Sequence, residues 1–368
     1  MTRFGIEEEF QLLDEDTLVP VPLGSSARAV LPSGAGTVTK EFLTSQVEFS
    51  TSPVRTLEAA ENQLSAFRGA LHAFAGRNQA VAAASGTPFG VGPAASVSES
   101  ERYGTIARWL GHIADGHHAN ALHVHIEVPD ADDRVRALNA VRPWMPTLLA
   151  LSGNSPFADG RDTGHETWRT VLMRRFPLAG CPPHFDGIGH YRAAVNRLVA
   201  QRIIPDIASV CWSARLSETY PTVELRVFDA QLTIEDTLFF AALGRALVET
   251  ALVDGTLIDG ATETDVAAHD GDTIQASIWA AARAGLDATL VHPTSGTLIP
   301  ARDSARLLLR TVTPALTDSG DVEFVVGHLD RILHAGTGAQ RQRAAYEKGG
   351  LRGLRELLRH HDETRSAA

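Results

Sequence analysis

Short runs in which apolar and polar residues alternate mark the N-terminal region of the chain and two later points. Alternation sends successive side chains to opposite faces and is typical of a half-buried strand. It predicts strands over residues 4–13, 37–51 (as two strands or one bent strand), 80–84, 121–128 and 222–228.

Apolar residues spaced three and four positions apart predict helices, above all in the last third of the chain. The clearest case is residues 57–76, where a leucine, alanine or phenylalanine recurs once per turn. Pro143 and Pro146 are expected to kink a helix over residues 132–150, because proline lacks the backbone N–H. Further helices are predicted near residues 98–115, 165–175, 187–202, 234–253, 272–284, 301–316, 319–334 and 338–361.

Well-separated strands come first and helices follow, which favours an α+β fold with an antiparallel sheet covered by helices on one face. A doubly wound fold is not expected, because strict alternation of strand and helix is missing. At 368 residues the chain can bury a large core. We expect a single domain over residues 1–368, with a mainly helical C-terminal part from about residue 255.

Composition and charge narrow the class of partner. The chain carries 33 Lys and Arg against 44 Asp and Glu, for a net charge of −11. Together with the lack of any basic run, this charge argues against nucleic-acid binding. It leaves anionic substrates open, because a bound metal ion can invert the local field.

No apolar run reaches transmembrane length and no signal-peptide pattern precedes the first strand, so we expect a cytoplasmic protein without a membrane partner. Cys181 and Cys211 lie outside any CxxC pattern. We interpret both as small buried hydrophobes and expect no disulfide framework. Base rates of oligomer symmetry favour a homodimer.

Polar side chains of metal-binding types interrupt four of the predicted strands. Glu7 and Glu9 share one face of the first strand, where consecutive acids are costly to bury unless a cation compensates them. If the strands pair in one sheet, a single face gathers the acids, histidines and arginine of all four. The later strands contribute Glu48, His123, His125, Glu224 and Arg226.

Each of these pieces also has a plainer interpretation. A solvated edge strand explains the acids, a hydrogen-bonded structural pair explains the two histidines, and an ordinary ion pair explains Glu224 with Arg226. Their combination favours a metal centre. Because carboxylates outnumber histidines, Mg²⁺ or Mn²⁺ is favoured over Zn²⁺, and the chain has no HExxH motif.

The chain also lacks a GxxxxGK[ST] loop and a GxGxxG motif after a strand. A nucleotide would therefore be held through metal ions and arginines. Arg161 and Arg169 are candidates, because they flank the irregular segment 152–164. A segment of that length without regular structure is often functional. His117 and His118 are interpreted as helix-end residues.

Taken together, the motifs resemble the glutamate–cysteine ligase type 2 family of carboxylate–amine ligases and, more distantly, glutamine synthetase. They occur in the order of that family and span residues 1 to about 230. The matching strings are Gly5-Ile6-Glu7-Glu8-Glu9-Phe10, Gln46-Val47-Glu48-Phe49, Leu122-His123-Val124-His125, Gly153-Asn154-Ser155-Pro156-Phe157, Gly160-Arg161-Asp162-Thr163-Gly164 and Thr222-Val223-Glu224-Leu225-Arg226.

The resemblance implies a saddle-shaped antiparallel sheet, like the glutamine synthetase catalytic domain, whose concave face holds ATP and two or three Mg²⁺ ions. It implies that Arg226 neutralises phosphate charge and, with Glu224, forms the catalytic pair. Arg161, Arg169 and His125 are placed near substrate or phosphate by position only. The metal ligands that it implies are Glu7, Glu9, Glu48, His123 and Glu224.

The implied activity is ATP-dependent amide formation through an acyl phosphate, nominally from glutamate and L-cysteine, with the identity of the amine left open. Residues 152–164 are then expected to form a lid or a substrate wall. Two alternatives stay open. One is a metal-dependent hydrolase that uses the same carboxylates and histidines, and the other is a non-catalytic binding protein, against which the full set of acids counts.

Overall fold

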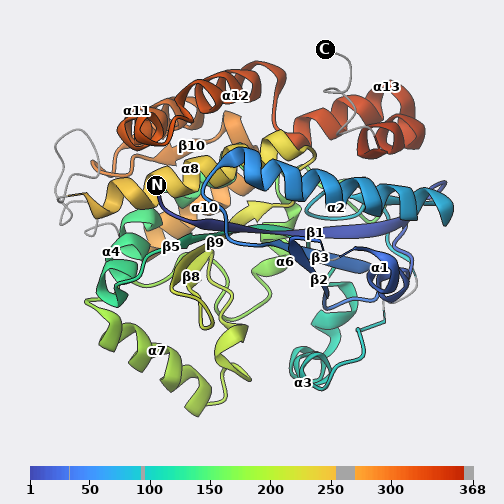
Figure 1. Cartoon of the computed structure of the whole chain (residues 1–368), viewed down its shortest axis with the longest axis horizontal. Coiled ribbons are helices and arrows are strands. Elements are labelled where there is room, and N and C mark those ends of the chain that lie inside the picture. The colour runs from blue at the N-terminus through green and yellow to red at the C-terminus, as the bar shows by residue number, and fades with distance from the viewer. Residues whose placement is uncertain (33, 93–95, 254–269, 360–368) are drawn as a thin grey trace.

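A seven-stranded antiparallel sheet organises the computed structural model, which describes residues 1–32, 34–92, 96–253 and 270–359 (Figure 1). The strands follow the order β2-β3-β1-β5-β9-β8, and β4 pairs with the second half of β1. The bounds are β1 (Phe4–Asp14), β2 (Gly36–Lys40), β3 (Gln46–Thr51), β4 (Ala80–Ala83), β5 (Ala121–Glu127), β8 (Ala214–Leu216) and β9 (Thr222–Asp229).

Long helices cover one face of this sheet, and shorter ones lie on the other side. In Figure 1 α2, α8, α11 and α12 lie above the sheet, whereas α3, α6 and α7 lie below it. The helices are α1 (Gly24–Val30), α2 (Leu57–Arg77), α3 (Glu101–Leu110), α4 (Ala131–Val141), α5 (Met145–Ser152), α6 (Trp168–Met173), α7 (Ile188–Ala200), α8 (Ile234–Leu252), α10 (Gly271–Ala284), α11 (Ala301–Ser319), α12 (Val322–Ala335) and α13 (Gly338–Arg359).

Strand β1 shows how the sequence separates the two faces. Phe4, Ile6 and Phe10 are almost completely buried, and Phe10 packs against Phe67 of α2. Glu8 lies on this apolar side and is neutralised there. Its carboxylate accepts hydrogen bonds from Arg68 Nε at 3.0 Å and Nη2 at 2.5 Å, and both side chains are buried. The opposite face of β1 is thereby left to Glu7 and Glu9.

A β-bulge changes which side chains of β9 share a face. Leu122 of β5 pairs with Phe228, but Val124 pairs with Leu225, so β9 contains one extra residue between these pairs. Phe228 stays in the core. The bulge therefore brings Asp229 to the face that carries Glu224 and Arg226, as bulges beside active sites commonly do.

The predicted α+β class with helices against an antiparallel sheet is confirmed. Residues 37–51 form two strands rather than one bent strand, and the proline-containing helix divides into α4 and α5 around a 3₁₀ turn at Arg142–Trp144. Helix α13 is kinked at Gly350, whose φ is +57°. Helix α1 and strand β8 were not predicted, and neither were the short hairpins β6 (Phe157–Ala158) with β7 (Arg161–Asp162) and β10 (Thr289–Val291) with β11 (Leu298–Pro300).

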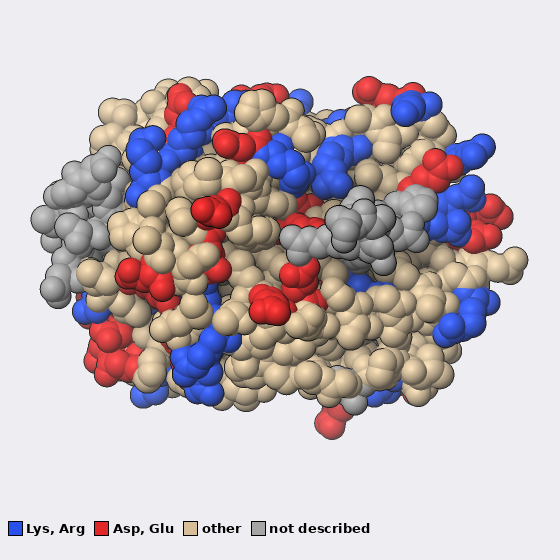
Figure 2. Space-filling model, turned by 45° about the horizontal axis from the view of Figure 1, so that its top comes forward, with Lys and Arg blue, Asp and Glu red and all other residues tan. Residues whose placement is uncertain are grey.

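The C-terminal helices share their hydrophobic core with the sheet. One contiguous cluster joins Phe4 and Phe228 of the sheet to Phe240 of α8 and Leu308 of α11. The predicted boundary near residue 255 lies outside the described residues. The helix-covered side seen in Figure 2 carries acidic and basic side chains interspersed over its surface. None of the described helices has the length and apolar character needed to cross a membrane.

Candidate active site

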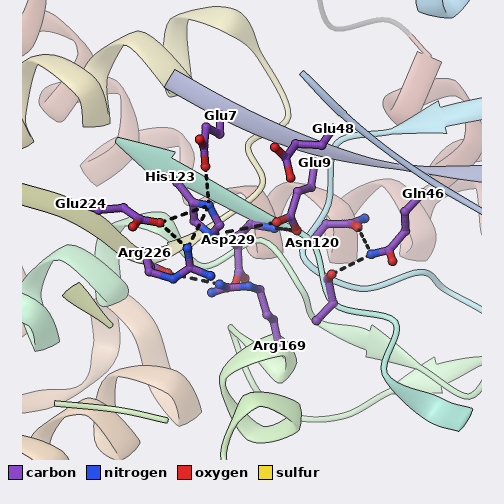
Figure 3. Close-up of polar contacts among 12 residues, drawn as sticks. Glu7, Glu9, Gln46, Glu48, Asn120, His123, Arg169, Glu224, Arg226 and Asp229 are labelled. Atoms are coloured by element: carbon purple, nitrogen blue, oxygen red, sulfur yellow. Dashed lines mark hydrogen bonds and ion pairs between the residues drawn. The ribbon is translucent and has the colours of Figure 1, made fainter. Parts of the chain in front are cut away.

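Strand register brings the predicted site residues together on the face of the sheet opposite α2 and α8. Glu7 of β1 pairs with His123 of β5, and His125 of β5 pairs with Glu224 of β9. On the other side of β1, Glu9 lies directly opposite Glu48 of β3. Figure 3 shows the side chains of Glu7, Glu9, Glu48, His123 and Glu224 gathered around one region of this face.

A first group of metal-competent side chains consists of Glu7, His125 and Glu224, whose potential ligand atoms lie within 4.8 Å of one another. His125 Nε2 is 3.3 Å from Glu7 Oε1, and His125 Nδ1 lies 3.0 Å from Thr222 Oγ1. His125 was expected beside substrate or phosphate. The structure places it beside two carboxylates, in a position suited to a metal ligand.

A second group consists of Glu9, Glu41 and Glu48, again with potential ligand atoms within 4.8 Å. Burial and the charge of Glu48 raise the pKa of Glu9 to about 8, and burial and the charge of Glu9 raise the pKa of Glu41 to about 7. Such shifts arise where burial and mutual repulsion outweigh the nearby positive charges, here those of Arg169 and Arg226. A divalent cation would supply further positive charge and restore their ionisation.

Glu41 was missed as a site residue in the sequence. It follows the last residue of β2, and its side chain reaches the acids of β1 and β3 from a loop. Gln46 fixes that loop, because its side-chain carbonyl accepts from Leu43 N at 3.0 Å and its amide donates to Asn120 Oδ1 at 2.7 Å. One sequence signal could have indicated Glu41. It follows Thr39 by two residues, so alternation places it on the same face of the strand as Thr39, which pairs with Glu48.

His123 lies between the two groups. Its Nδ1 is 3.1 Å from Glu7 Oε2, and its Nε2 is 4.0 Å from Glu9 Oε1. Nε2 is buried and has no hydrogen-bond partner within the described part of the chain. Burial and the charge of Arg226 lower the pKa of His123 to about 4, so the imidazole is neutral and able to bind a metal. An orphaned buried nitrogen beside clustered carboxylates fits the predicted divalent cation.

Two arginines hold Glu224. Arg215 of β8 donates from Nε at 2.6 Å and from Nη2 at 3.3 Å, and Arg226 donates to the same carboxylate. Although burial opposes ionisation, Arg226 and Arg215 hold the pKa of Glu224 below its ordinary range. Arg215 was not predicted from the sequence. Glu224 belongs to the first group of metal-competent side chains. Both of its carboxylate oxygens accept hydrogen bonds from guanidinium groups, and a metal ion would have to displace them.

Arg169 and Asp229 form the floor next to these groups. Arg169 Nη2 donates to the backbone carbonyl of Arg226 at 3.1 Å, and Arg169 Nη1 lies 3.8 Å from Asp229 Oδ1 (Figure 3). Asp229 is fully buried and accepts hydrogen bonds from Ser155 Oγ at 2.7 Å and Thr167 Oγ1 at 3.0 Å. Arg169 is thus held in place from behind.

Residues 152–164 were expected to form a lid or a substrate wall. Asn154 and Ser155 are buried and hydrogen bonded to Asp229, so the first half of this segment lies behind the site. None of its residues lines the clefts described below.

Arg161, expected beside nucleotide or substrate, lies outside both clefts described below. It is exposed in β7, after a turn at Asp159 and Gly160, both of which have positive φ. Its position beside the irregular segment 152–164 in the sequence did not indicate where the side chain of Arg161 would lie.

Two clefts open onto the charged face and share Glu7 and Glu48. The first, which we call the aromatic cleft, has a volume of about 310 Å³ and is lined by Arg169 and Arg226. Its far wall consists of Phe42, Tyr103, Ile106, Trp109, His117 and Phe176.

The second cleft, which we call the hydroxyl cleft, has a volume of about 530 Å³. The rings of Tyr220 and His125 lie on one side of it, with centroids 6.4 Å apart in an edge-to-face arrangement. Six hydroxyl side chains contribute to the rest of the lining, together with apolar residues and the charged pair Arg3 and Glu127. The six are Thr37, Thr39, Ser50, Thr51, Ser52 and Thr222.

Comparison with known proteins places this arrangement in a family. A family model described as glutamate–cysteine ligase family 2 matches residues 3–360. A relative from Saccharopolyspora erythraea, named as a glutamate–cysteine ligase 2, is 40% identical over 364 residues, which cover 96% of this chain and 90% of that protein. The chain belongs to glutamate–cysteine ligase family 2. A relative of the same name from Nocardia farcinica is 38% identical over 93% of this chain and 88% of its own length.

Solved structures show that the family fold is shared more widely. The glutamate–cysteine ligase of Francisella tularensis, in complex with AMP, has a TM-score of 0.70 at 14% identity and covers 97% of this chain and 87% of that one. A bifunctional glutathione synthetase from Pasteurella multocida has a TM-score of 0.68 at 16% identity, covering 97% and 52% respectively. The predicted family is confirmed, and with it the class of ATP-dependent ligase.

Further sequence predictions can be compared with the structure of this family member. Cys181 and Cys211 are free and only partly buried, whereas the sequence led us to expect both to be buried. His117 follows the 3₁₀ turn Gly111–Gly116, as expected of a helix-end residue, but it also lines the aromatic cleft. The roles predicted for the charged residues remain proposals.

Proposed function

We propose that this protein joins a carboxylic acid to an amine at the expense of ATP, through an acyl phosphate, with glutamate as the nominal acid. The observation that carries the proposal is the position of His123, between two carboxylate groups and 3.4 Å from Arg226 Nη1. Phosphoryl transfer needs concentrated positive charge and precise positioning rather than a protein nucleophile. Carboxylates that bind metal cations, together with neighbouring arginines, would supply this positive charge in fixed positions.

The size and lining of the two clefts support an arrangement in which the nucleotide binds in one cleft and the acid and the amine bind in the other. The hydroxyl cleft is the larger, and it offers hydroxyl groups for a ribose and base together with the rings of Tyr220 and His125 for stacking. We assign the nucleotide to this cleft, with its phosphates directed toward Glu7 and Glu48. The acid and the amine then occupy the aromatic cleft, which reaches the same two carboxylates from the other side.

Two sets of residues would hold the metal ions. The first comprises Glu7, His125 and Glu224, with His123 beside them, and the second comprises Glu9, Glu41 and Glu48. Oxygen-rich sites with a minority of imidazole suit Mg²⁺ or Mn²⁺. Bound there, the ions would neutralise phosphate charge and so reduce the repulsion between ATP and an attacking carboxylate.

The arginines would position the anions. Arg226 reaches both Glu224 and His123, so it lies where a transferring phosphoryl group would carry its charge. Arg169 also lines the aromatic cleft, next to Arg226, and would hold the carboxylate of the acid. Arg215 keeps Glu224 ionised and oriented throughout.

The chemistry balances in two steps. A carboxylate oxygen of the acid forms a bond to the γ-phosphorus of ATP, and the bond from that phosphorus to the β–γ bridging oxygen breaks to release ADP. The amine nitrogen then attacks the acyl carbon, phosphate leaves with its electron pair, and the amine releases a proton. The first step replaces an oxide leaving group with phosphate, which is why ATP is needed.

Release of ADP from ATP and Mg²⁺ tests the proposal when candidate acids and amines are supplied singly and in pairs, with mass detection of the product. A ligase releases ADP at a substantial rate only when both partners are present, and an amide accumulates in equal amount. A metal-dependent hydrolase with the same residues would cleave its substrate without ATP. Equal ADP release with and without the amine, and no amide, would overturn the proposal.

A further inference from the structure

A connected set of aromatic rings forms the far wall of the aromatic cleft. The ring centroids of Tyr103 and Phe42 are 5.8 Å apart, those of Phe42 and His117 6.3 Å, and those of His117 and Phe176 4.6 Å. Trp109 continues the series at 6.4 Å from Phe176. These contacts are tilted or edge-to-face, the geometries that aromatic side chains prefer, so the wall is a packed surface.

The side of α3 that faces the cleft is only partly covered by the protein. Tyr103, Ile106 and Trp109, spaced three residues apart along α3, line the cleft and are partly buried, whereas Leu110 is buried in a small satellite cluster. Apolar surface left open inside a cleft gains from being covered by an apolar group. The wall therefore favours a substrate with a large apolar part.

The wall meets the charged floor at both ends. Phe42 directly follows Glu41 of the second carboxylate group, and Tyr103 donates from its hydroxyl to the carbonyl of Lys40 at 3.1 Å. At the other end, burial and the charge of Arg169 lower the pKa of His117 to about 3, so its ring stays neutral. A molecule whose apolar body lies on the wall thus has its polar end either among the acids or next to Arg169.

The charge of the second group identifies which substrate that molecule is. Three carboxylates exceed the charge of one divalent cation by one unit, so Glu9, Glu41 and Glu48 would still attract an ammonium group after binding a metal ion. The arginines Arg169 and Arg226 attract the acid instead. A cysteine, with one methylene and a sulfur beyond its Cα, would cover only a small part of the wall.

We propose that the amine acceptor of this ligase carries an aromatic or comparably bulky apolar group, which packs against Phe42, Tyr103, Trp109 and Phe176. The inference rests on the proposed function and specifies its substrate class. The amine binds with its nitrogen toward Glu41 and its ring on the wall, and the acid occupies the part of the cleft next to Arg169.

A matched panel of amines tests this inference. ADP release with ATP, Mg²⁺ and glutamate or other simple acids is measured for cysteine, ethylamine, phenethylamine and tryptamine, and for aromatic acids combined with ethylamine. We expect kcat/KM for an aromatic amine to exceed that for cysteine and for ethylamine at least tenfold, as filling an apolar pocket allows. Cysteine at or above the aromatic amines would overturn the inference and leave the ligase activity intact.

Other outcomes of the same panel are also decisive. A preference for aromatic acids with ethylamine would show that the wall binds the acid and would overturn its assignment to the amine. Absence of ADP from every pair would overturn the proposed function and this inference with it. The two failures are therefore distinguishable.

Variants of the wall supply the structural control. Trp109→Ala should lower the ratio of kcat/KM for phenethylamine to that for ethylamine about tenfold. Trp109→Leu provides a second variant if the alanine protein is unstable. Trp279→Ala, which removes a half-exposed tryptophan outside both clefts, should leave the ratio unchanged. An unchanged ratio in both Trp109 variants would contradict the proposal.

Discussion

Asp229 lies directly behind Arg169, with Asp229 Oδ1 3.8 Å from Arg169 Nη1 and both side chains buried. The bulge in β9 creates this relationship, because simple alternation from Glu224 would place Asp229 on the opposite face. The carboxylate is fixed by Ser155, Thr167 and the backbone N–H of Asn154. It therefore acts as a rigid counter-charge that aims the guanidinium of Arg169 into the aromatic cleft.

Asp229→Asn should impair binding of the acid substrate. The substitution keeps the shape of the side chain but removes the charge behind Arg169. We expect KM for the acid to rise about tenfold, equivalent to about 1.4 kcal/mol, while KM for ATP stays within twofold. Asp162→Asn, at an exposed residue paired with Arg343 outside the clefts, serves as the control. Equal losses for acid and ATP would indicate a general structural defect instead.

Glu48→Gln should separate stability from metal binding. In EDTA, removing one of three crowded carboxylates relieves repulsion, so the free energy of unfolding should rise by on the order of 1 kcal/mol. With Mn²⁺ as the probe, metal affinity should fall about 10- to 100-fold, because a ligand is lost. Urea unfolding and Mn²⁺ electron paramagnetic resonance measure the two effects. Glu58→Gln, at an exposed position of α2, should change neither.

Breaking the buried pair Glu8–Arg68 should destabilise the fold without changing the reaction. Arg68→Ala leaves the Glu8 carboxylate buried without its bidentate partner, which typically costs about 3–5 kcal/mol. The double variant Glu8→Gln with Arg68→Met should recover part of that loss. Chemical unfolding measures both. Activity assayed below the unfolding transition should stay within twofold, and a large loss of kcat in the folded double variant would contradict a purely structural role.

Acid should destabilise the protein partly through His118. This side chain is buried, and its Nδ1 contacts Gln11 Nε2 at 3.0 Å. Burial lowers its pKa to about 4 in the folded protein, against about 6.5 in an unfolded chain. As the pH falls below about 6.5, the unfolded chain takes up a proton that the folded protein refuses, so stability declines until about pH 4.

His118→Gln should therefore lose about 2 kcal/mol less stability than the wild type between pH 7.5 and pH 5, measured by urea unfolding at both values. His112→Gln is the matched control, because the side chain of His112 is almost fully exposed. Identical pH dependence of the His118 variant and the wild type would exclude this contribution.

Strand alternation was sufficient to predict most of the charged face. Glu7, Glu9, His123 and Glu224 lie on that face because period-two patterning leaves them no place in the core. Alternation fails where the strand pattern ends. Glu41 belongs to a loop, and Arg215 lies in a strand of three residues, too short to display a period.

Other features of the site depend on three-dimensional geometry that local sequence does not encode. The bulge that turns Asp229 toward Arg169 involves one extra residue within an otherwise regular strand. Arg161 follows a turn at Asp159 and Gly160, both of which have positive φ, and its side chain is exposed. The aromatic wall joins α3 to residues after α6, segments about seventy positions apart, and only tertiary packing brings them together.

Transfer of labelled oxygen tests the central claim most directly. The acid that gives the fastest ADP release is prepared with ¹⁸O in its reacting carboxylate and incubated with ATP, Mg²⁺ and the amine. An acyl phosphate transfers one carboxylate oxygen to each phosphate released, so mass spectrometry should find one ¹⁸O per phosphate and an amide that has lost one label. Phosphate without carboxylate-derived ¹⁸O would contradict the account, because water would then have cleaved ATP directly.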